Sequence, residues 1–283
     1  MVPGDPALQI AGRHASAESL ATIRSELGLD QPWYTQYFMM LKQYLQLDFG
    51  RSYAYKTKII DMISDGAGAS LSLLLPPFLI SIFLSLGLGI FVAINRGRWN
   101  DRAAVAFSVG GQSISLLVYI LAGQYFLAYK WGWFPISGYD TSWSGRWEYL
   151  VLPSIIYVVL SLAPQMRFYR TVILDELYQD YVRTARSKGL GTGPIMFRHV
   201  LKNALIPIIT DVVISIPFLI LGALLLESYF SIPGLGDIIV RAIANNDRPV
   251  LMSMTVFGTM AYIVFNVISD ILYALADPRV EVR

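Results

Sequence analysis

The stretch that decides the fold is Asp180–Pro207, which reads DYVRTARSKGLGTGPIMFRHVLKNALIP. It is polar, basic and interrupted by glycines, yet it stands between two strongly apolar runs, Tyr149–Met166 and Ala204–Leu226. Such a basic interruption is typical of a loop that joins two membrane helices on one side of a bilayer. The rest of the chain must then show whether it crosses a membrane.

The composition is that of a membrane protein. Of 283 residues, 55% are hydrophobic and only 15% are charged, whereas soluble domains carry roughly 25% charged residues. The chain has no cysteine, which excludes a disulfide framework and a thiolate metal site. Its net charge of +2 is too small to indicate nucleic acid as a partner.

Five apolar runs are long enough to cross a lipid bilayer, which takes about 20 mostly apolar residues. They are Ala67–Asn95, Ala103–Tyr129, Tyr149–Met166, Ala204–Leu226 and Pro249–Ala276. Since lipid tolerates neither irregular backbone nor open sheet edges, these runs are expected to be helices. The sequence therefore predicts an all-α polytopic membrane protein with five spans.

Basic residues in the short loops predict the orientation. Twelve Lys and Arg residues follow the first and third runs or lie in the C-terminal tail, whereas four lie in the alternate short loops. Short cytoplasmic loops are enriched in Lys and Arg. We therefore expect a multi-pass protein of the cell (inner or plasma) membrane, with the loop 170–204 and the tail in the cytoplasm.

This orientation places residues 1–66 outside the membrane on the extracytoplasmic side. A segment of that length without a preceding signal or anchor is awkward to export. The simplest expectation is a further membrane helix upstream of Met1.

Two short amphipathic helices are predicted within residues 1–66. Ser16 can cap the first, and Gly28 can end it. Its apolar face carries Leu20, Ile23 and Leu27. The second begins at Pro32 and presents Trp33, Tyr37, Phe38, Leu41, Tyr44 and Leu45. These side chains suit either a helix on the outer membrane interface or the core of a small cap.

The polar stretch itself is expected to form two helices outside the membrane. Residues 174–187 follow a helical period, with charged side chains on one face. The other face is apolar and comprises Leu174, Leu177, Tyr178, Tyr181 and Ala185. Gly189 provides a stop, and Pro194 favours the start of a helix that runs into the fourth span. Such a surface helix can lie on lipid headgroups, which the physics alone favours, or be gripped by a cytoplasmic partner.

The stretch resembles the cytoplasmic loop of ABC-importer permeases of the dipeptide/oligopeptide branch. Tyr181–Leu190 and Arg198–Pro207 carry the resemblance. The general importer motif, Glu-Ala-Ala followed after three residues by Gly, falls on Arg183–Ala185 and Gly189, with Arg replacing Glu as is usual in the peptide branch. Further matching segments are Pro3–Pro6, Glu26–Pro32, Phe49–Ser52, Phe134–Tyr139, Glu227–Gly236 and Tyr273–Arg279.

The resemblance implies the permease subunit of an ATP-driven importer with a type I-like transmembrane bundle. Residues 67–283 would form the permease domain, lacking the family's first helix, and 170–204 its coupling loop. The implied partners are a second homologous permease, two ATPase subunits that bind ATP and Mg, and an extracytoplasmic solute-binding protein. No cofactor is expected in this chain. Di- and oligopeptides are the expected substrates, with nickel chelates and oligosaccharides left open.

The resemblance also assigns the residues that would contact or position the ATPase. These coupling residues are Tyr181, Arg183, Thr184, Ala185, Arg186, Lys188, Gly189, Gly193 and Pro194. In this reading the basic face is gripped by the ATPase, while Tyr178, Tyr181 and Ala185 pack under the bundle.

Polar residues inside the spans are candidates for a substrate pathway, because polar groups in lipid are costly. The candidates are Asp211, Asn266, Asp270 and Gln112, followed by Gln124 and Gln165. Each of them can equally serve as a hydrogen-bonding partner between neighbouring helices.

Two other functions must be compared with the importer. Gly234–Asp237 matches the Gly-x-Gly-Asp signature of intramembrane aspartyl proteases, and Tyr139-Asp140 offers a second Asp after Tyr. Both lie outside the apolar runs, whereas two catalytic carboxylates must share a buried site. An ion-coupled secondary transporter would use carboxylates within the spans and need no ATPase. The chain lacks a Gly-x4-Gly-Lys-Ser/Thr motif, so it is not expected to bind ATP itself.

Overall fold

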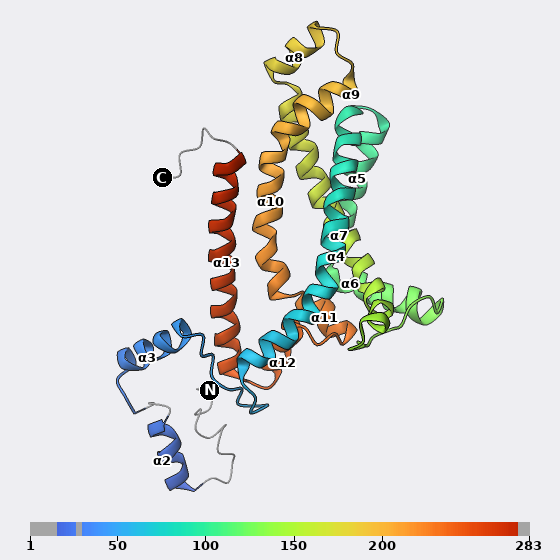
Figure 1. The fold of residues 1–283 in the computed structure, drawn as a ribbon. Coiled ribbons are helices and arrows are strands. Elements are labelled where there is room, and N and C mark those ends of the chain that lie inside the picture. The colour runs from blue at the N-terminus through green and yellow to red at the C-terminus, as the bar shows by residue number, and fades with distance from the viewer. Residues whose placement is uncertain (1–15, 27–29, 277–283) are drawn as a thin grey trace. The chain divides into compact units, whose positions relative to one another are not determined.

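A computed structural model describes residues 16–26 and 30–276 (Figure 1). Within these ranges the structure is helical apart from one isolated bridge between Arg51 and Lys58. The helices are α2 Ala17–Glu26, α3 Trp33–Leu45, α4 Ile59–Ile94, α5 Trp99–Gln112, α6 Leu116–Ala122, η1 Gly123–Lys130, α7 Trp143–Leu177, α8 Asp180–Ser187, α9 Thr192–Ile195, η2 Met196–Val200, α10 Leu201–Leu221, α11 Leu224–Phe230, α12 Leu235–Ala244 and α13 Arg248–Ala276. The predicted all-α fold is confirmed.

Contacts divide the chain into two compact units. The first comprises Met1–Asp65 and Ile238–Phe257, and the second comprises Gly66–Asp237 and Gly258–Arg283.

The buried carboxylate of Asp247 holds the first unit together. Asp247 is 1% exposed and accepts hydrogen bonds from the backbone N–H groups of Tyr53 (3.2 Å) and Ala54 (3.0 Å) and from the Ser52 hydroxyl. A buried charge is tolerated only with such partners. These bonds explain why residues 238–257 pack with the N-terminal segment.

Helix α2 begins where the sequence predicts. The backbone N–H of Ser19 donates to the Ser16 hydroxyl (3.2 Å), which satisfies one of the free amide groups at the helix start. The side chain of Ile23, together with Leu27 and Gly28, lies outside the described part of the chain.

Helix α3 begins directly after Pro32, also as predicted. Tyr44 is buried, with its ring centroid 5.8 Å from that of Phe49. Most of the apolar face is exposed, with Trp33 at 80% and Phe38 at 65%. This exposure is what a helix on a membrane interface requires.

Among residues 16–26 and 30–276, four helices are long and apolar enough to cross a membrane, and a fifth span results if one bent pair counts as a single span. The four are Ile59–Ile94, Trp143–Leu177, Thr192–Leu219 and Arg248–Ile268. The prediction of five spans therefore agrees with the larger count.

The second predicted span is not one straight helix. Helix α5 and the following helix Leu116–Lys130 meet at an angle of 90°. The break follows Gly110 and Gly111, which weaken a helix because glycine loses much conformational freedom in it. At the bend, the carbonyl of Gly111 accepts from the backbone N–H of Ile114 (3.3 Å) and from the Tyr119 hydroxyl (2.9 Å), and the second bond joins the two arms.

The fourth predicted span also ends earlier than its apolar run. Gly222 has φ +80°, a conformation that side chains disfavour, and it ends α10 at Leu221. The apolar residues 224–226 belong instead to α11, a separate short helix. Hydrophobicity alone does not mark this break.

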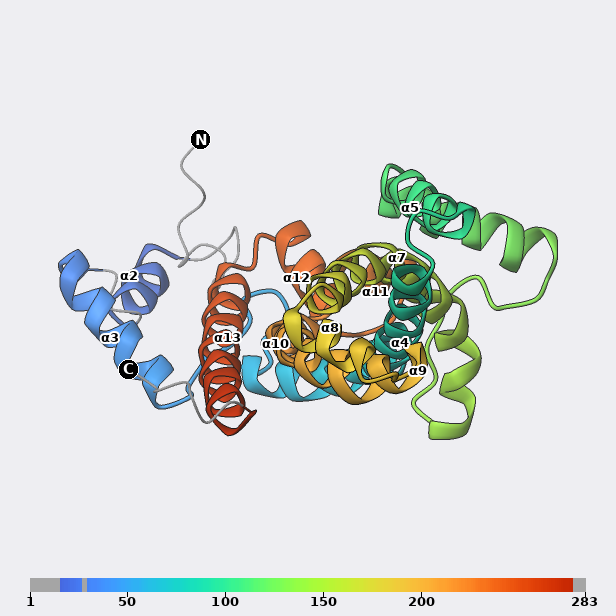
Figure 2. The ribbon, with the colours of Figure 1, turned by 90° about the horizontal axis from the view of Figure 1, so that it is seen from above.

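The second unit has two buried cores along its long helices. Helices α7 and α10 run beside each other, with α8 and α9 at one end and α11 at the other (Figures 1 and 2). The loop-end core comprises Ala93, Tyr169, Ile173, Leu174, Val182, Ala185, Ile195, Met196, Val200, Ala204 and Ile208. The far-end core comprises Ala69, Leu73, Leu74, Phe78, Ile120, Ala128, Leu150, Leu152, Ile156, Leu219, Leu226, Phe230 and Ile232.

Candidate coupling site

The loop between α7 and α10 ends α8 with a glycine cap. Gly189 has φ +82°, and its backbone N–H donates to the carbonyl of Arg186 (2.9 Å). The next N–H, that of Leu190, donates to the carbonyl of Ala185 (3.3 Å). This pair of bonds is a Schellman motif, which satisfies carbonyls at the end of a helix. The predicted stop at Gly189 is confirmed.

The helix boundaries around this cap differ in detail from the prediction. Helix α7 continues to Leu177, and a short break at Tyr178 and Gln179 separates it from α8. The second helix begins at Thr192, two residues before Pro194. From there Thr192–Leu219 is continuous through α9, η2 and α10, so the expected helix that runs from the loop into the fourth span is present.

Helix α8 rests on the start of this long helix through two small buried side chains. Val182 is fully buried and Ala185 is 5% exposed, and both belong to the loop-end core with Ile195 and Met196. Val182 is not on the predicted apolar face, although its spacing of three from Ala185 places the two on one side of a helix. These contacts make α8 and the start of the long helix one packed body.

The predicted packing of the two tyrosines is only partly correct. Tyr178 is 59% exposed, and the Arg96 guanidinium lies 5.1 Å from the centroid of its ring. Tyr181 is half-buried, and its hydroxyl donates to the Glu176 carboxylate. Burial, and then this hydrogen bond, raise the pKa of Tyr181 above its usual value.

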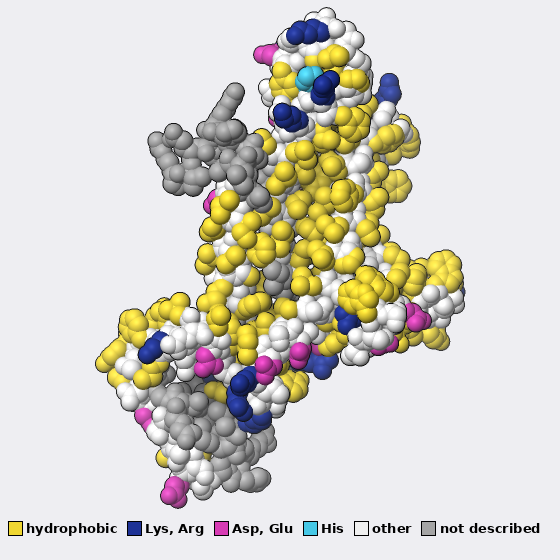
Figure 3. Space-filling view, in the orientation of Figure 1, with side chains coloured by type: hydrophobic (Ala, Val, Ile, Leu, Met, Phe, Trp, Pro, Cys, Tyr) yellow, Lys and Arg dark blue, Asp and Glu magenta, His cyan; other side chains and the backbone are white. Residues whose placement is uncertain are grey.

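The loop has an exposed basic edge, which is formed by Arg183, Arg186 and Lys188. Figure 3 shows Lys, Arg and His side chains gathered over the α8–α9 end, next to a largely hydrophobic flank of the long helices. The exposed predicted coupling residues are Arg183, Thr184, Arg186, Lys188, Gly189, Gly193 and Pro194. The only other charge on α8, Asp180, lies 3.5 Å from Arg183 with both side chains largely exposed, a contact of little energetic weight.

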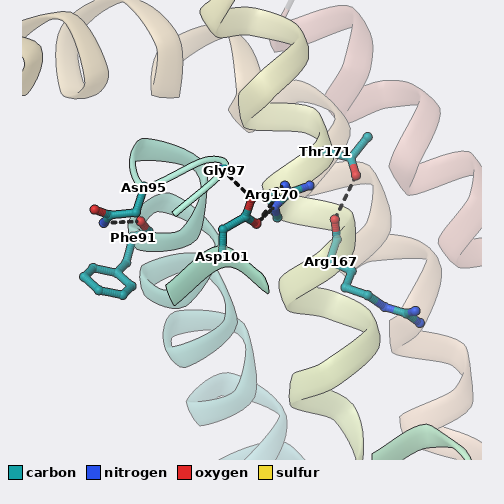
Figure 4. Close-up of polar contacts among 7 residues, drawn as sticks. All are labelled: Phe91, Asn95, Gly97, Asp101, Arg167, Arg170 and Thr171. Carbon is teal, nitrogen blue, oxygen red and sulfur yellow. Dashed lines mark hydrogen bonds and ion pairs between the residues drawn. The ribbon is translucent and has the colours of Figure 1, made fainter. Parts of the chain in front are cut away.

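A buried ion pair fixes the base of this loop (Figure 4). Arg170 of α7 donates through Nε (2.8 Å) and Nη2 (3.0 Å) to the two oxygens of Asp101 on α5, and Asp101 is 6% exposed. The backbone N–H of Gly97 also donates to Asp101 (2.8 Å). Two-pronged Arg–carboxylate pairs fix geometry as well as charge. The sequence predicts Arg170 only as a cytoplasmic charge and does not reveal its pairing with Asp101.

The four candidate pathway residues are not brought together by hydrogen bonds or ion pairs in the described part of the chain. Asp211 on α10 accepts from the Tyr169 hydroxyl (3.4 Å), and Gln112 on α5 accepts from the Arg167 guanidinium. On α13, Asn266 is half-buried and Asp270 is exposed.

The two further glutamines bond neighbouring segments. The side-chain amide of Gln124 donates to the carbonyls of Ile136 (3.1 Å) and Tyr229 (3.0 Å). The Gln165 side chain accepts from the Ser85 hydroxyl (3.2 Å). In both cases the polar group joins parts of the bundle.

The protease-like motif Gly234–Asp237 lies against a buried carboxylate, that of Glu227, which is not among the predicted site residues. Glu227 is fully buried, and the backbone N–H groups of Gly236 (2.7 Å) and Asp237 (3.1 Å) donate to it. Burial raises the pKa of Glu227, while these hydrogen bonds and that of the Ser70 hydroxyl oppose the rise. The signal for this carboxylate lies in the segment Glu227–Gly236, which the resemblance identifies only as a family motif.

The second half of that protease signature has a local structural role. Asp140 accepts from the backbone N–H of Ser142 (2.8 Å), and this bond lowers the pKa of Asp140. An aspartyl dyad instead needs one carboxyl with a raised pKa. In the described ranges, no group of three His, Asp or Glu residues could hold a metal ion.

Two family models together match nearly the whole chain, and both describe membrane components of binding-protein-dependent transport systems. Residues 85–282 match the family model described as binding-protein-dependent transport system inner membrane component, and residues 1–74 match the N-terminal model of such membrane components. The chain is 32% identical to the glutathione transport system permease protein GsiC of Escherichia coli K12, over 100% of this chain and 91% of that protein. It is 35% identical to a probable peptide ABC transporter permease protein, y4tP, of Sinorhizobium fredii, over 99% of this chain and 91% of that protein.

Proposed function

Because the chain belongs to the family of inner membrane components of binding-protein-dependent transport systems, we propose that it imports short peptides and is driven through the loop around α8. The family and its relatives make it a multi-pass ABC importer permease subunit, a transport component and not an enzyme. Both relatives described above are named for peptides or for glutathione, itself a tripeptide. Peptides of a few residues are therefore the proposed substrate class.

The observation that carries the coupling role is the continuous helix Thr192–Leu219. Its first turns lie outside the apolar part of the span and hold α8 through Val182 and Ala185. A force applied to α8 is thus passed to a span without an intervening flexible joint. The exposed Arg183, Arg186 and Lys188 supply a positive surface for an ATPase groove.

The assembly proposed around this chain follows the family. A second homologous permease would complete the pathway, two ATPase subunits would bind ATP and Mg, and an extracytoplasmic binding protein would deliver the substrate. The loop 170–204 and the tail are proposed to be cytoplasmic, and residues 1–66 extracytoplasmic, on the distribution of Lys and Arg.

Co-purification of the partner ATPases tests the docking surface. Reversing two charges, Arg186→Glu with Lys188→Glu, is expected to remove the ATPases from the purified complex. Arg102→Glu is the matched control, because Arg102 is also exposed and basic but lies on α5. If the ATPases remain bound to the doubly reversed chain, the basic edge does not dock them, and contact with lipid headgroups becomes the better account.

Reconstitution in liposomes separates this function from ion-coupled transport. Uptake of labelled glutathione or dipeptides is expected only when the second permease, the ATPases, the binding protein and ATP are all present. Uptake by the purified chain alone under an ion gradient would overturn the proposal in favour of a secondary transporter.

A further inference from the structure

The coupling site does not involve Glu227, the buried carboxylate at the opposite end of α10. One of its oxygens, Oε1, accepts from the Ser70 hydroxyl (2.7 Å) and from the backbone N–H of Ala223 (3.1 Å). The other, Oε2, accepts from the backbone N–H groups of Gly236 (2.7 Å) and Asp237 (3.1 Å). All four partners donate, which is the surrounding that an ionised carboxylate needs.

Three of the four donors are backbone N–H groups at the ends of helices. Ala223 follows the break that ends α10, and Gly236 and Asp237 lie in the first turn of α12, where amide groups have no partner within the helix. Ser70 belongs to α4, and its hydroxyl also accepts from the backbone N–H of Leu235 (2.8 Å). One carboxylate therefore joins the end of α10, the start of α11 and the first turn of α12 to α4.

At three positions around this carboxylate, only glycine fits, because a side chain would collide with Glu227 or with nearby backbone. A Cβ atom on Gly222 would lie 2.5 Å from Oε1 of Glu227, and one on Gly234 would lie 2.3 Å from Oε2. A Cβ on Gly236 would lie 2.7 Å from the backbone of Leu224. Real Cβ atoms do not approach so closely, so the Gly-x-Gly sequence is required by the packing around Glu227. This is a structural account of the motif that resembled a protease signature.

For the long helix Thr192–Leu219 to tilt when α8 moves, its far end must be held in place. The long helix Thr192–Leu219 carries α8 at one end, while the chain just beyond its other end is bonded to α4 through Glu227 and Ser70. If this far end were free to slide, motion of α9 would shift the span along itself instead of tilting it.

We propose that Glu227 is a positioning residue that anchors the far end of α10 to α4 and provides the fixed point about which the span tilts during transport. The inference rests on the proposed coupling function. It assigns to Ser70 and Glu227 a joint role in converting ATPase closure into helix movement, without contact with substrate.

Distances between spin labels test the anchor. This chain has no cysteine, so labels attached to it before assembly with its partners mark only the introduced thiols. The first label pair is Leu75→Cys on α4 with Leu225→Cys on α11, both exposed positions. In the full complex with its partner permease and ATPases, this distance is expected to be narrow and unchanged by ATP. The second pair, Phe91→Cys with Phe197→Cys, lies at the loop end and is expected to change its distance with ATP.

Variants of the anchor complete the experiment. Ser70→Ala removes the bond to α4 but leaves the backbone bonds of Glu227, and Glu227→Gln offers an amide group to N–H donors. Either change is expected to broaden the first distance and to lower the peptide imported per ATP while ATP hydrolysis continues. Ser81→Ala is the matched control, because Ser81 is equally buried on α4 and its hydroxyl donates within the same helix, to the carbonyl of Phe78.

The outcomes are separable. If the first distance changes with ATP in the unaltered chain, or stays narrow in Ser70→Ala with normal coupling, the anchor is wrong while the coupling function stands. If the second distance does not change with ATP, the proposed coupling through the long helix is wrong. The proposed role of Glu227 as its anchor is then wrong as well. A parallel fall of ATP hydrolysis, transport and folded protein would reduce Glu227 to a purely structural residue.

Discussion

Gly189, Ala185 and Asp101 show how single residues shape the coupling loop. Gly189 takes a left-handed conformation that ends α8, and Ala185 is small enough to let α8 lie on the long helix. Asp101 receives Arg170 in a largely buried pair at the base of the loop. Each role depends on a property that another side chain lacks, namely backbone freedom, size or charge.

Gly189→Ala is expected to strain the loop. Its φ of +82° costs a residue with a Cβ atom about 1–2 kcal/mol, although no atom lies within 4 Å of the new Cβ. The affinity for the partner ATPases, measured by titration in detergent, should fall. Gly87→Ala on α4 is the control, since it also meets open space, has no positive φ and is not one of the coupling residues. Equal effects of the two changes would exclude backbone strain as the cause.

Asp101→Asn is expected to destabilise the fold. Removing one member of a buried ion pair costs about 3–5 kcal/mol because the other charge stays buried, and here the side chains of Arg170 and Asp101 are 20% and 8% exposed. The midpoint of thermal unfolding should drop. Asp180→Asn breaks an ion pair whose side chains are 74% and 96% exposed, and it should leave the midpoint unchanged. An unchanged midpoint for Asp101→Asn would contradict the importance of the buried pair.

At the scale of elements, the stability of α8 depends on its packing against the start of the long helix Thr192–Leu219. With eight residues it is too short to be stable alone, since isolated helices below about 12–15 residues are marginal. Its stability comes from Val182 and Ala185 in the loop-end core and from the glycine cap. The element is therefore rigid only as part of the long helix that it rests on.

Ala185→Leu is expected to displace α8 from the long helix. The site is 5% exposed, and overfilling a packed core costs about 1–3 kcal/mol. Protease sensitivity of the loop should rise and ATPase binding should fall. Thr184→Leu adds a similar side chain at an exposed neighbouring position and should leave the protease sensitivity of the loop unchanged. An insensitive Ala185→Leu chain would mean that α8 does not need this contact.

At the scale of the whole molecule, the chain has to be placed across a membrane. The count of twelve against four basic residues in alternating loops argues for a cytoplasmic α8 and an extracytoplasmic N-terminal segment. The four or five candidate spans are compatible with this arrangement.

Thiol labelling checks the orientation. Ser187→Cys on the loop and Thr57→Cys in the N-terminal segment place single thiols at exposed positions of a chain without cysteine. An impermeant maleimide applied to intact spheroplasts should label the chain with Thr57→Cys and spare the chain with Ser187→Cys until the membrane is opened. The reverse pattern would overturn the proposed orientation.

The sequence by itself determined the class of the protein, the all-α fold and the family. Long apolar runs, glycine stops and short motifs each consist of residues that are close together in the chain, so they can be recognised without knowing the fold. It also located the end of α8 at Gly189 and the helix that leaves the loop for the fourth span. It placed the spans less well where the break is conformational, as at Gly222 and at the 90° bend after α5.

Only the tertiary structure decided which polar residues meet. The bonds of Arg170 to Asp101 and of Glu227 to Ser70 join residues 69 and 157 positions apart in the chain. Hydropathy and helical period carry no information about such distant pairs. They form because a buried charge must find donors or an opposite charge, and the packing of helices determines which ones lie within reach.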